Sequence, residues 1–169
     1  MAAPMFTVNT HRHDPYRTFK FQLLIDGRPV AGLKKMGALK KKTEAIKWRT
    51  GGDPSHERIL PGGTSYEPIT LEQGLTHDPV FEAWAALVNN VEGDAAMSLK
   101  NFRKDLVINV LNMQGQVAIS YKILRAWVSE YQALPDLDSQ AMSAVGIQTL
   151  TLQHEGWQRD TSVPEPAET

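Results

Sequence analysis

The segment that decides the fold runs from Lys41 to Gly74 and reads KKTEAIKWRTGGDPSHERILPGGTSYEPITLEQG. Its two ends, KKTEAIKW and ITLEQG, have the alternation of apolar and polar residues that is typical of strands. Between them, Arg49–Pro68 holds seven Gly or Pro residues, against 22 in the whole chain of 169. Connections longer than about 12–15 residues are uncommon in compact domains and are usually functional. We therefore predict a long protruding β-hairpin with a functional tip.

The two strands of this hairpin carry apolar residues that need cover. Ile46 and Trp48 share one face of the first strand, and the second strand presents Ile69 and Leu71. Pro68 has no N–H to donate, so the second strand should begin after it or lie at a sheet edge. A two-stranded ribbon is only marginally stable in water. We expect another subunit to supply part of the missing cover.

Composition restricts the class of protein. At 169 residues the chain fits one domain, which at this size buries roughly 70 % of its unfolded surface. It has no Cys, which excludes disulfides and thiolate metal sites. Its net charge of −1 argues against bulk attraction to nucleic acid or membrane. No apolar run approaches the ~20 residues of a membrane span, so we expect a soluble protein without stable membrane insertion.

Three segments are expected along the chain. Residues 1–13 show no sustained hydrophobic period and should form a flexible N-terminal arm, and residues 161–169 should form a flexible acidic, Pro-rich tail. Residues 14–160 should form a single domain.

The first expected strand precedes a strong turn signal. Asp26-Gly27 favours the positive φ angles of a tight hairpin, and residues 29–39 should return as its second strand. Four apolar residues alternate along the first strand and should face the core: Phe19, Phe21, Leu23 and Ile25.

Two longer strands and a final one follow later in the chain. Residues 104–113 and 116–131 should be joined at Gln114-Gly115, with Arg125 breaking the apolar alternation of the second strand. The last strand, in residues 143–155, changes phase. A bulge near Gln148-Thr149 would keep four apolar residues facing the core: Val145, Ile147, Leu150 and Leu152.

One helix is predicted, in residues 77–93. Asp78 is the expected N-cap and Pro79 the first helical residue. Phe81 and Trp84 belong to an apolar stripe at helical spacing, which should close the open side of a β-structure. About six to eight strands and this one helix indicate a mainly β fold. We expect a small antiparallel β-barrel or two packed β-sheets, with one flanking α-helix and the long hairpin.

Few residues suggest chemistry. His11–Asp14 lies in the loose arm, where a metal site would lack support, and Asp78 beside His77 already serves the helix. Ser55-His56 lies in the hairpin tip, and His154 has no carboxylate partner on its own face. The Gly-rich stretches lack the Lys-Ser/Thr of a phosphate-binding loop. We therefore expect no catalytic residue, no metal, no cofactor and no enzymatic activity.

A run of lysines has three interpretations. Lys34, Lys35 and Lys40–Lys42 could protect a sheet edge from aggregation, bind nucleic acid, or pair with an acidic surface on an identical neighbour. Aromatic residues are not interleaved with these lysines, which disfavours nucleic acid. The other two interpretations stay open.

Four segments, in order, carry a family resemblance: DPYRTFKFQLLIDG from Asp14, GLKKMGALKKKTEAIKWRTGGDPS from Gly32, LPGGTSYEPITLEQGLTHDPVFEAWA from Leu60, and GIQTLTLQHEGWQRD from Gly146. Together they resemble the tube proteins of contractile phage tails, and look most like the inner tube proteins of extracellular contractile injection systems. The likeness spans Asp14 to Asp160. It is most specific in the hairpin tip and the residues that follow it.

The resemblance implies a structural protein. Six copies would form a ring, and stacked rings would make a hollow tube inside a contractile sheath, driven through a target envelope to deliver protein cargo. A phage tail tube that conducts DNA, or a tube-initiating paralogue at the baseplate, are the alternatives. The implied partners are further copies of the chain, the sheath, baseplate or hub proteins, a terminator and the cargo. Assembly would take place in the bacterial cytoplasm, and the particle would be released extracellularly.

The resemblance also assigns roles to residues. The hairpin contacts between rings and neighbours would use Lys42, Glu44, Ile46, Trp48, Arg49, Asp53, Pro54, Arg58, Tyr66, Ile69 and Leu71. The strand alternation, the capping signals and the helical stripe described above, and not the resemblance, assign Phe19, Phe21, Asp78, Pro79, Phe81 and Trp84 to the structural core and helix.

Overall fold

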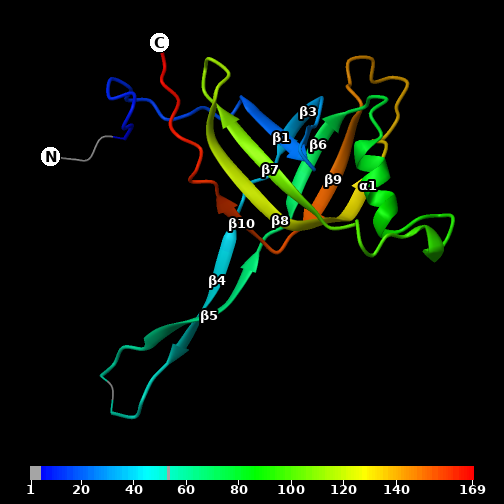
Figure 1. The fold of residues 1–169 in the computed structure, drawn as a ribbon. Coiled ribbons are helices and arrows are strands. Elements are labelled where there is room, and N and C mark those ends of the chain that lie inside the picture. Colours follow the sequence, from blue (N-terminus) through cyan, green and yellow to red (C-terminus); the bar gives the residue numbers. More distant parts are fainter. Residues whose placement is uncertain (1–4, 53) are drawn as a thin grey trace.

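The computed structural model describes residues 5–52 and 54–169 and shows a curved β-structure flanked by one α-helix (Figure 1). A two-stranded ribbon leaves this body and points away from it. Among the described residues, no helix is long and apolar enough to cross a membrane.

The elements follow one another in this order: β1 Phe21–Ile25, β2 Arg28–Pro29, β3 Leu33–Met36, β4 Lys41–Trp48, β5 Arg58–Tyr66, β6 Ile69–Gly74, α1 Val80–Val88, the 3-10 helix η1 Asp94–Ala96, β7 Lys104–Leu111, β8 Val117–Gln132, β9 Ile147–Gln153 and β10 Gly156–Arg159.

The body consists of antiparallel strands in the order β2-β1-β7-β8-β9-β6-β3, with β10 also paired to β8. β8 is shared: its first part pairs with β7 and β10, and its last part pairs with β9. The strands therefore form two sheets that face each other across the core. In the described part of the chain, β2 and β3 end the order without pairing with each other, so the structure is an open sandwich and not a closed barrel.

The change from one sheet to the other takes place at Arg125. This residue has a φ of 51° and opens a bulge at which β7 and β8 shift register. The expected break in alternation at Arg125 is therefore confirmed. Because of the extra residue, both Ile123 and Ala126 point into the core, where each is fully buried. The N–H of Arg125 donates to Oδ1 of Asp105 (3.0 Å), and its Nε lies 3.2 Å from Oε2 of Glu155.

The first hairpin forms as the Asp-Gly turn predicts. Asp26 and Gly27 both have positive φ angles, 51° and 79°. The return strand is much shorter than expected, because the chain turns again at Gly32 (φ 69°) and then pairs with β6 as β3. Phe21 packs against the core, but Phe19 precedes β1 and is 57 % exposed. The expectation of a core position for Phe19 is wrong.

The ribbon pairs differently from the prediction. β4 pairs with β5, which lies inside the segment expected to be the tip, and β6 belongs to the body between β3 and β9. Ile69 and Leu71 are therefore fully buried core residues and not part of a ribbon face. The start of β6 directly after Pro68 agrees with the prediction.

The last long strand keeps a single phase. β9 pairs with β6 without a bulge, so Gln148 faces the core with Leu150 and Leu152, and Val145 is 77 % exposed. The predicted bulge at Gln148-Thr149 is wrong. Burying Gln148 is acceptable because its amide donates to the buried Gln73 and accepts from the Tyr131 hydroxyl (2.9 Å).

Helix α1 covers one side of the sandwich. It begins at Val80, one residue later than predicted, so Pro79 takes the cap position. Asp78 still satisfies a free helical N–H, because its Oδ1 accepts from Val80 (3.1 Å). Phe81 and Trp84 are buried as predicted, and the Trp84 indole donates to the carbonyl of residue 102 (2.8 Å).

The two ends of the chain contact each other. The Glu165 carboxylate accepts the N–H groups of Thr7 (2.8 Å), Val8 (3.0 Å) and Asn9 (3.0 Å). Arg12 forms an ion pair with Glu168. The described part of the N-terminal arm is thus bound to the C-terminal tail. The sequence predicted two separate flexible ends and did not predict this contact.

Truncating Trp84 should destabilise the protein. Trp84→Ala removes a large buried side chain, so we expect the free energy of unfolding to fall by roughly 3–5 kcal/mol. Urea unfolding followed by circular dichroism measures this. Val91→Ala is the control, because Val91 is fully exposed and should leave the unfolding midpoint unchanged. Equal effects of the two variants would contradict the buried role of Trp84.

Acid should release the contact between the termini. Burial acts to raise the pKa of Glu165, but the N–H groups of Val8, Asn9 and Thr7 and the Asn9 side chain favour the charged form and lower it to about 2, from 4.5. The folded pKa is the lower one, so the stabilisation is complete above pH 4.5 and is lost as the pH falls towards 2.

The amide resonances of Thr7, Val8 and Asn9 should report this release in an NMR titration, with a midpoint near pH 2. In Glu165→Gln the same resonances should lack that transition at all pH values. A wild-type midpoint near 4.5, the value of a free carboxylate, would show that the contact does not form in solution.

Candidate assembly interface

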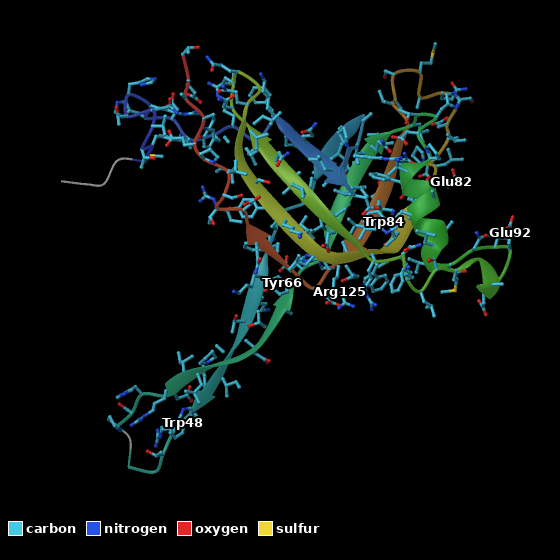
Figure 2. All side chains as sticks on the ribbon, in the orientation of Figure 1. Trp48, Tyr66, Glu82, Trp84, Glu92 and Arg125 are labelled. Atoms are coloured by element: carbon cyan, nitrogen blue, oxygen red, sulfur yellow. The ribbon has the colours of Figure 1, made fainter. Side chains whose placement is uncertain are left out.

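The ribbon, defined as β4, β5 and the described residues between them (49–52 and 54–57), is exposed along most of its length. Its two strands pair with each other and with no other described strand. Every residue of β4 is exposed to solvent. Figure 2 shows Trp48 near the far end of the ribbon and Tyr66 at its base. Such a ribbon offers two unpaired edges to another chain.

One face of the ribbon is apolar. Ile46 lies opposite Leu60, and Trp48 lies opposite Arg58, whose guanidinium stacks over the indole ring at 5.5 Å. Ile46, Trp48 and Leu60 are 48 %, 38 % and 45 % exposed. Lys47 is on the other face, opposite Ile59. Three neighbouring apolar side chains are thus open to solvent on one side, which marks an interaction surface.

Two glycines in β5 differ in what surrounds them. A Cβ atom on Gly62 would lie 3.0 Å from Cδ1 of Ile46 and 3.2 Å from the carbonyl oxygen of Glu44. A Cβ atom on Gly63 would meet nothing within 4 Å. Gly62 is therefore the residue that allows Ile46 to lie close across the ribbon, whereas Gly63 has no such packing role.

The base of the ribbon is attached firmly to the body. The Tyr66 ring packs against His154 (5.7 Å between centroids) and Trp157 (6.5 Å). The N–H of Glu67 donates to the carbonyl of Lys40 (3.2 Å), and the Glu67 carbonyl lies 3.0 Å from Nε2 of His154. His154 therefore contacts both Tyr66 and Glu67 at the base of the ribbon and has a structural role there. The ribbon direction is fixed where it leaves the body.

Charges are distributed unevenly over the molecule. No Lys or Arg occurs in residues 59–99 or 126–158, which together hold Glu67, Glu72, Asp78, Glu82, Glu92, Asp94, Glu130, Asp136, Asp138 and Glu155. The fold brings parts of these two ranges together, because α1 packs on β8 and β6 pairs with β9. The sequence already contained this signal, but its meaning depends on the fold. The helix side of the molecule is acidic, whereas residues 41–66, which span the ribbon, hold five Lys or Arg residues against three acidic ones.

A groove of about 550 Å³ lies on this acidic side, between α1 and the last part of β8. Ala85, Val88 and Val128 give it apolar walls. Glu82 and Glu130 also line it, and both are exposed. The groove therefore combines an apolar interior with negative charge.

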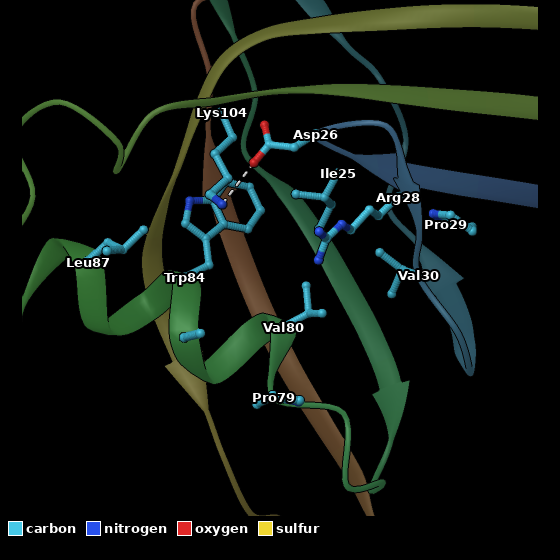
Figure 3. A pocket seen from close by; sticks show the side chains of 11 residues that line it. Ile25, Asp26, Arg28, Pro29, Val30, Pro79, Val80, Trp84, Leu87 and Lys104 are labelled. Atoms are coloured by element: carbon cyan, nitrogen blue, oxygen red, sulfur yellow. Dashed lines mark hydrogen bonds and ion pairs between the residues drawn. The ribbon is translucent and has the colours of Figure 1, made fainter.

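A second hollow, of about 520 Å³, lies between the β1–β2 hairpin and α1 (Figure 3). Trp84 and Val80 line it, and Nζ of Lys104 donates to Oδ2 of Asp26 (2.9 Å). The charges of Lys104 and Asp26 therefore neutralise each other. In the parts of the chain that the structure describes, no three His, Asp or Glu side chains gather as a metal site.

The structure distributes the predicted interface residues over three places. The ribbon holds Lys42, Glu44, Ile46, Trp48, Arg49, Pro54, Arg58 and Tyr66. Ile69 and Leu71 lie in the core instead, because the partner of β4 is β5. Asp53 is outside the described residues. The sequence-based prediction did not include Ile59 and Leu60, because the breakers Pro61-Gly62-Gly63 beside them hid the strand β5.

The T4-like virus tail tube protein gp19 family matches residues 17–158, most of the chain. This chain belongs to that family. No curated protein matches it by sequence at a significant level.

Solved structures share the tail tube fold. A chain in the anti-feeding prophage tube-terminating cap aligns with a TM-score of 0.72 and 20 % identity, covering 89 % of this tail tube family member and 93 % of that chain. A chain in the sheath-tube complex of the extracellular contractile injection system PVC aligns with a TM-score of 0.69 and 17 % identity, covering 86 % and 91 %. Hcp1 of Flavobacterium johnsoniae aligns at 0.51 and 16 %, covering 82 % and 93 %.

Filling the space above Gly62 should loosen the ribbon. Gly62→Val places methyl groups against Ile46 and the Glu44 carbonyl, so we expect faster hydrogen exchange for the amides of β4 and β5. Gly63→Val is the matched control and should exchange like the wild type. The unfolding midpoint should be equal in both variants, because the core lies elsewhere. Equal exchange in the two variants would show that Ile46 does not pack over Gly62.

Proposed function

We propose that this tail tube family member is a structural subunit of the inner tube of a contractile injection system. Six copies form a ring, and rings stack into a hollow tube within a contractile sheath. The observation that carries the proposal is the protruding ribbon, with its exposed apolar face, in a chain of the tail tube family. A monomer gains nothing from such a surface, whereas an assembly covers it.

Ring formation also accounts for the sheet edges. β2 and β3 end the strand order, and Lys34 and Lys35 on β3 are exposed, which suits an edge that must not aggregate freely. Lys35 lies 4.0 Å from Glu72 of the neighbouring strand. In a closed ring of identical subunits, each edge meets a defined surface of the next copy. The lysines then limit pairing to the correct partner.

The likeness to chains in the anti-feeding prophage and PVC structures favours an injection system that delivers protein. A phage tail tube that conducts DNA is the second candidate, because the matching family takes its name from a virus tail. A tube-initiating or terminating paralogue is the third, since a baseplate chain and a terminator chain align about as well as the tube chain. Purified particles with or without a DNA-filled capsid separate the first two.

The proposed partners follow from this role. They are further copies of the chain, a sheath protein around the tube, baseplate and terminator proteins at its ends, and cargo in the lumen. The subunit carries no catalytic step and needs no cofactor. It assembles in the bacterial cytoplasm, and the finished particle acts outside the cell.

Removing the ribbon should abolish assembly but leave the fold intact. Lys41 pairs directly with Tyr66, so Lys42–Ser65 can be replaced by Asn-Gly without moving the ribbon base. We expect the wild-type unfolding midpoint and a monomer in sedimentation, with no rings or tubes in negative-stain images. Long tubes built by the shortened chain would contradict the proposed role of the ribbon.

A point variant refines the same experiment. Trp48→Ala should weaken assembly in proportion to the apolar area that it removes, at about 25 cal/mol per Å². Leu137→Ala is the control, because Leu137 is an exposed apolar residue away from the ribbon. Equal losses in both variants would assign the effect to general surface apolarity.

A further inference from the structure

The ribbon and the groove beside α1 have complementary properties on opposite sides of the molecule. We propose that the apolar face of the ribbon of one subunit binds the groove between α1 and the last part of β8 of the next subunit. This inference rests on the proposed assembly function and names the surface that receives the ribbon. It also assigns a role to the acidic side chains of the groove.

The apolar parts fit each other in kind. Ile46, Trp48 and Leu60 lie close together on one ribbon face and are each more than a third exposed. The groove offers Ala85, Val88 and Val128 as walls. Small side chains on α1 leave room for a large aromatic ring, and an aromatic anchor in a pocket typically dominates an interface. Trp48 is the natural anchor.

The charges fit as well. Arg58 lies on the apolar face of the ribbon, opposite Trp48, and Arg49 follows Trp48 in the sequence; both are exposed. Glu82 and Glu130 of the groove are exposed too, and the residue ranges 59–99 and 126–158 contain no Lys or Arg to neutralise them. A ribbon with a net positive charge in an acidic groove steers association and fixes its direction. The third interpretation of the lysine run, pairing with an acidic surface on an identical neighbour, extends to this ribbon.

Geometry selects a second copy as the occupant. Figure 2 shows Trp48 and Glu82 on opposite sides of the molecule, and the ribbon points away from α1. The ribbon therefore cannot reach the groove of its own subunit. A contact between two different surfaces of identical chains is head-to-tail, and it closes into a ring or continues as a stack. Each groove then receives one ribbon.

Charge reversal tests the contact. Glu82→Lys with Glu130→Lys should raise the concentration needed for assembly by on the order of tenfold or more, because like charges then face each other. Arg49→Glu with Arg58→Glu should do the same. The chain that carries all four substitutions should recover most of the assembly, since the charges attract again with reversed signs. Sedimentation and negative-stain imaging measure each variant.

The matched control is Asp136→Lys with Asp138→Lys. It changes the net charge by the same amount on the acidic side but lies outside the groove lining. We expect wild-type assembly from it. Normal assembly of the Glu82/Glu130 variant, or failure of the fourfold variant to recover, would overturn the proposed contact. Wild-type protein that forms neither rings nor tubes would instead overturn the proposed function.

Cross-linking tests the same contact by a second method. The chain has no Cys, so single cysteines report only on the chosen positions. Mixed Ile46→Cys and Ala86→Cys proteins should form a disulfide-linked heterodimer under oxidising conditions, and each variant alone should form far less. Ile46→Cys mixed with Gln114→Cys, at the exposed β7–β8 turn, should not cross-link. Equal cross-linking to positions 86 and 114 would contradict a specific site.

Discussion

The fold depends on the change of phase in β8 at Arg125. Side chains alternate along a strand, and a bulge both bends the strand and shifts the phase of this alternation by one residue. Arg125 is the bulged residue: it has a positive φ of 51°, and its backbone N–H donates to Oδ1 of Asp105. With Ile123 and Ala126 both buried, one strand of 16 residues connects the two sheets. The core between the sheets, the surface on which α1 packs and the groove beside α1 all depend on this continuous strand.

The ribbon shows the opposite situation, since it has no core of its own. Among the strands that the structure describes, β4 and β5 pair only with each other, and Thr43 and Thr64 add one side-chain contact of 3.0 Å. Tyr66 holds the base against β10 through the Trp157 ring. The ribbon is therefore fixed in direction but left uncovered along its length. This combination suits an element that is completed by another subunit and does not stabilise the monomer.

Local signals predicted the local features of the fold. The Asp26-Gly27 turn, the Asp78 contact at the start of α1 and the buried Trp84 depend on neighbours in the sequence and could be predicted from it. The partner of β4 could not, because Pro61-Gly62-Gly63 mimics a loop, and only an exposed edge tolerates a proline inside a strand. The phase predicted for the strand β9 was wrong for a similar reason. Gln148 is buried only because Gln73, far away in the chain, satisfies its amide.

The candidate interface combines both kinds of information. The absence of Lys and Arg from residues 59–99 and 126–158 is visible in the sequence, yet a charge count close to zero conceals it. Only the fold places α1 on β8 and directs the ribbon away from both. A subunit with a positively charged, apolar ribbon on one side and an acidic groove on the other cannot bring these two surfaces together within one molecule. In a ring-and-stack assembly the same weak contact recurs in every subunit, so small individual energies act together and make the assembly stable.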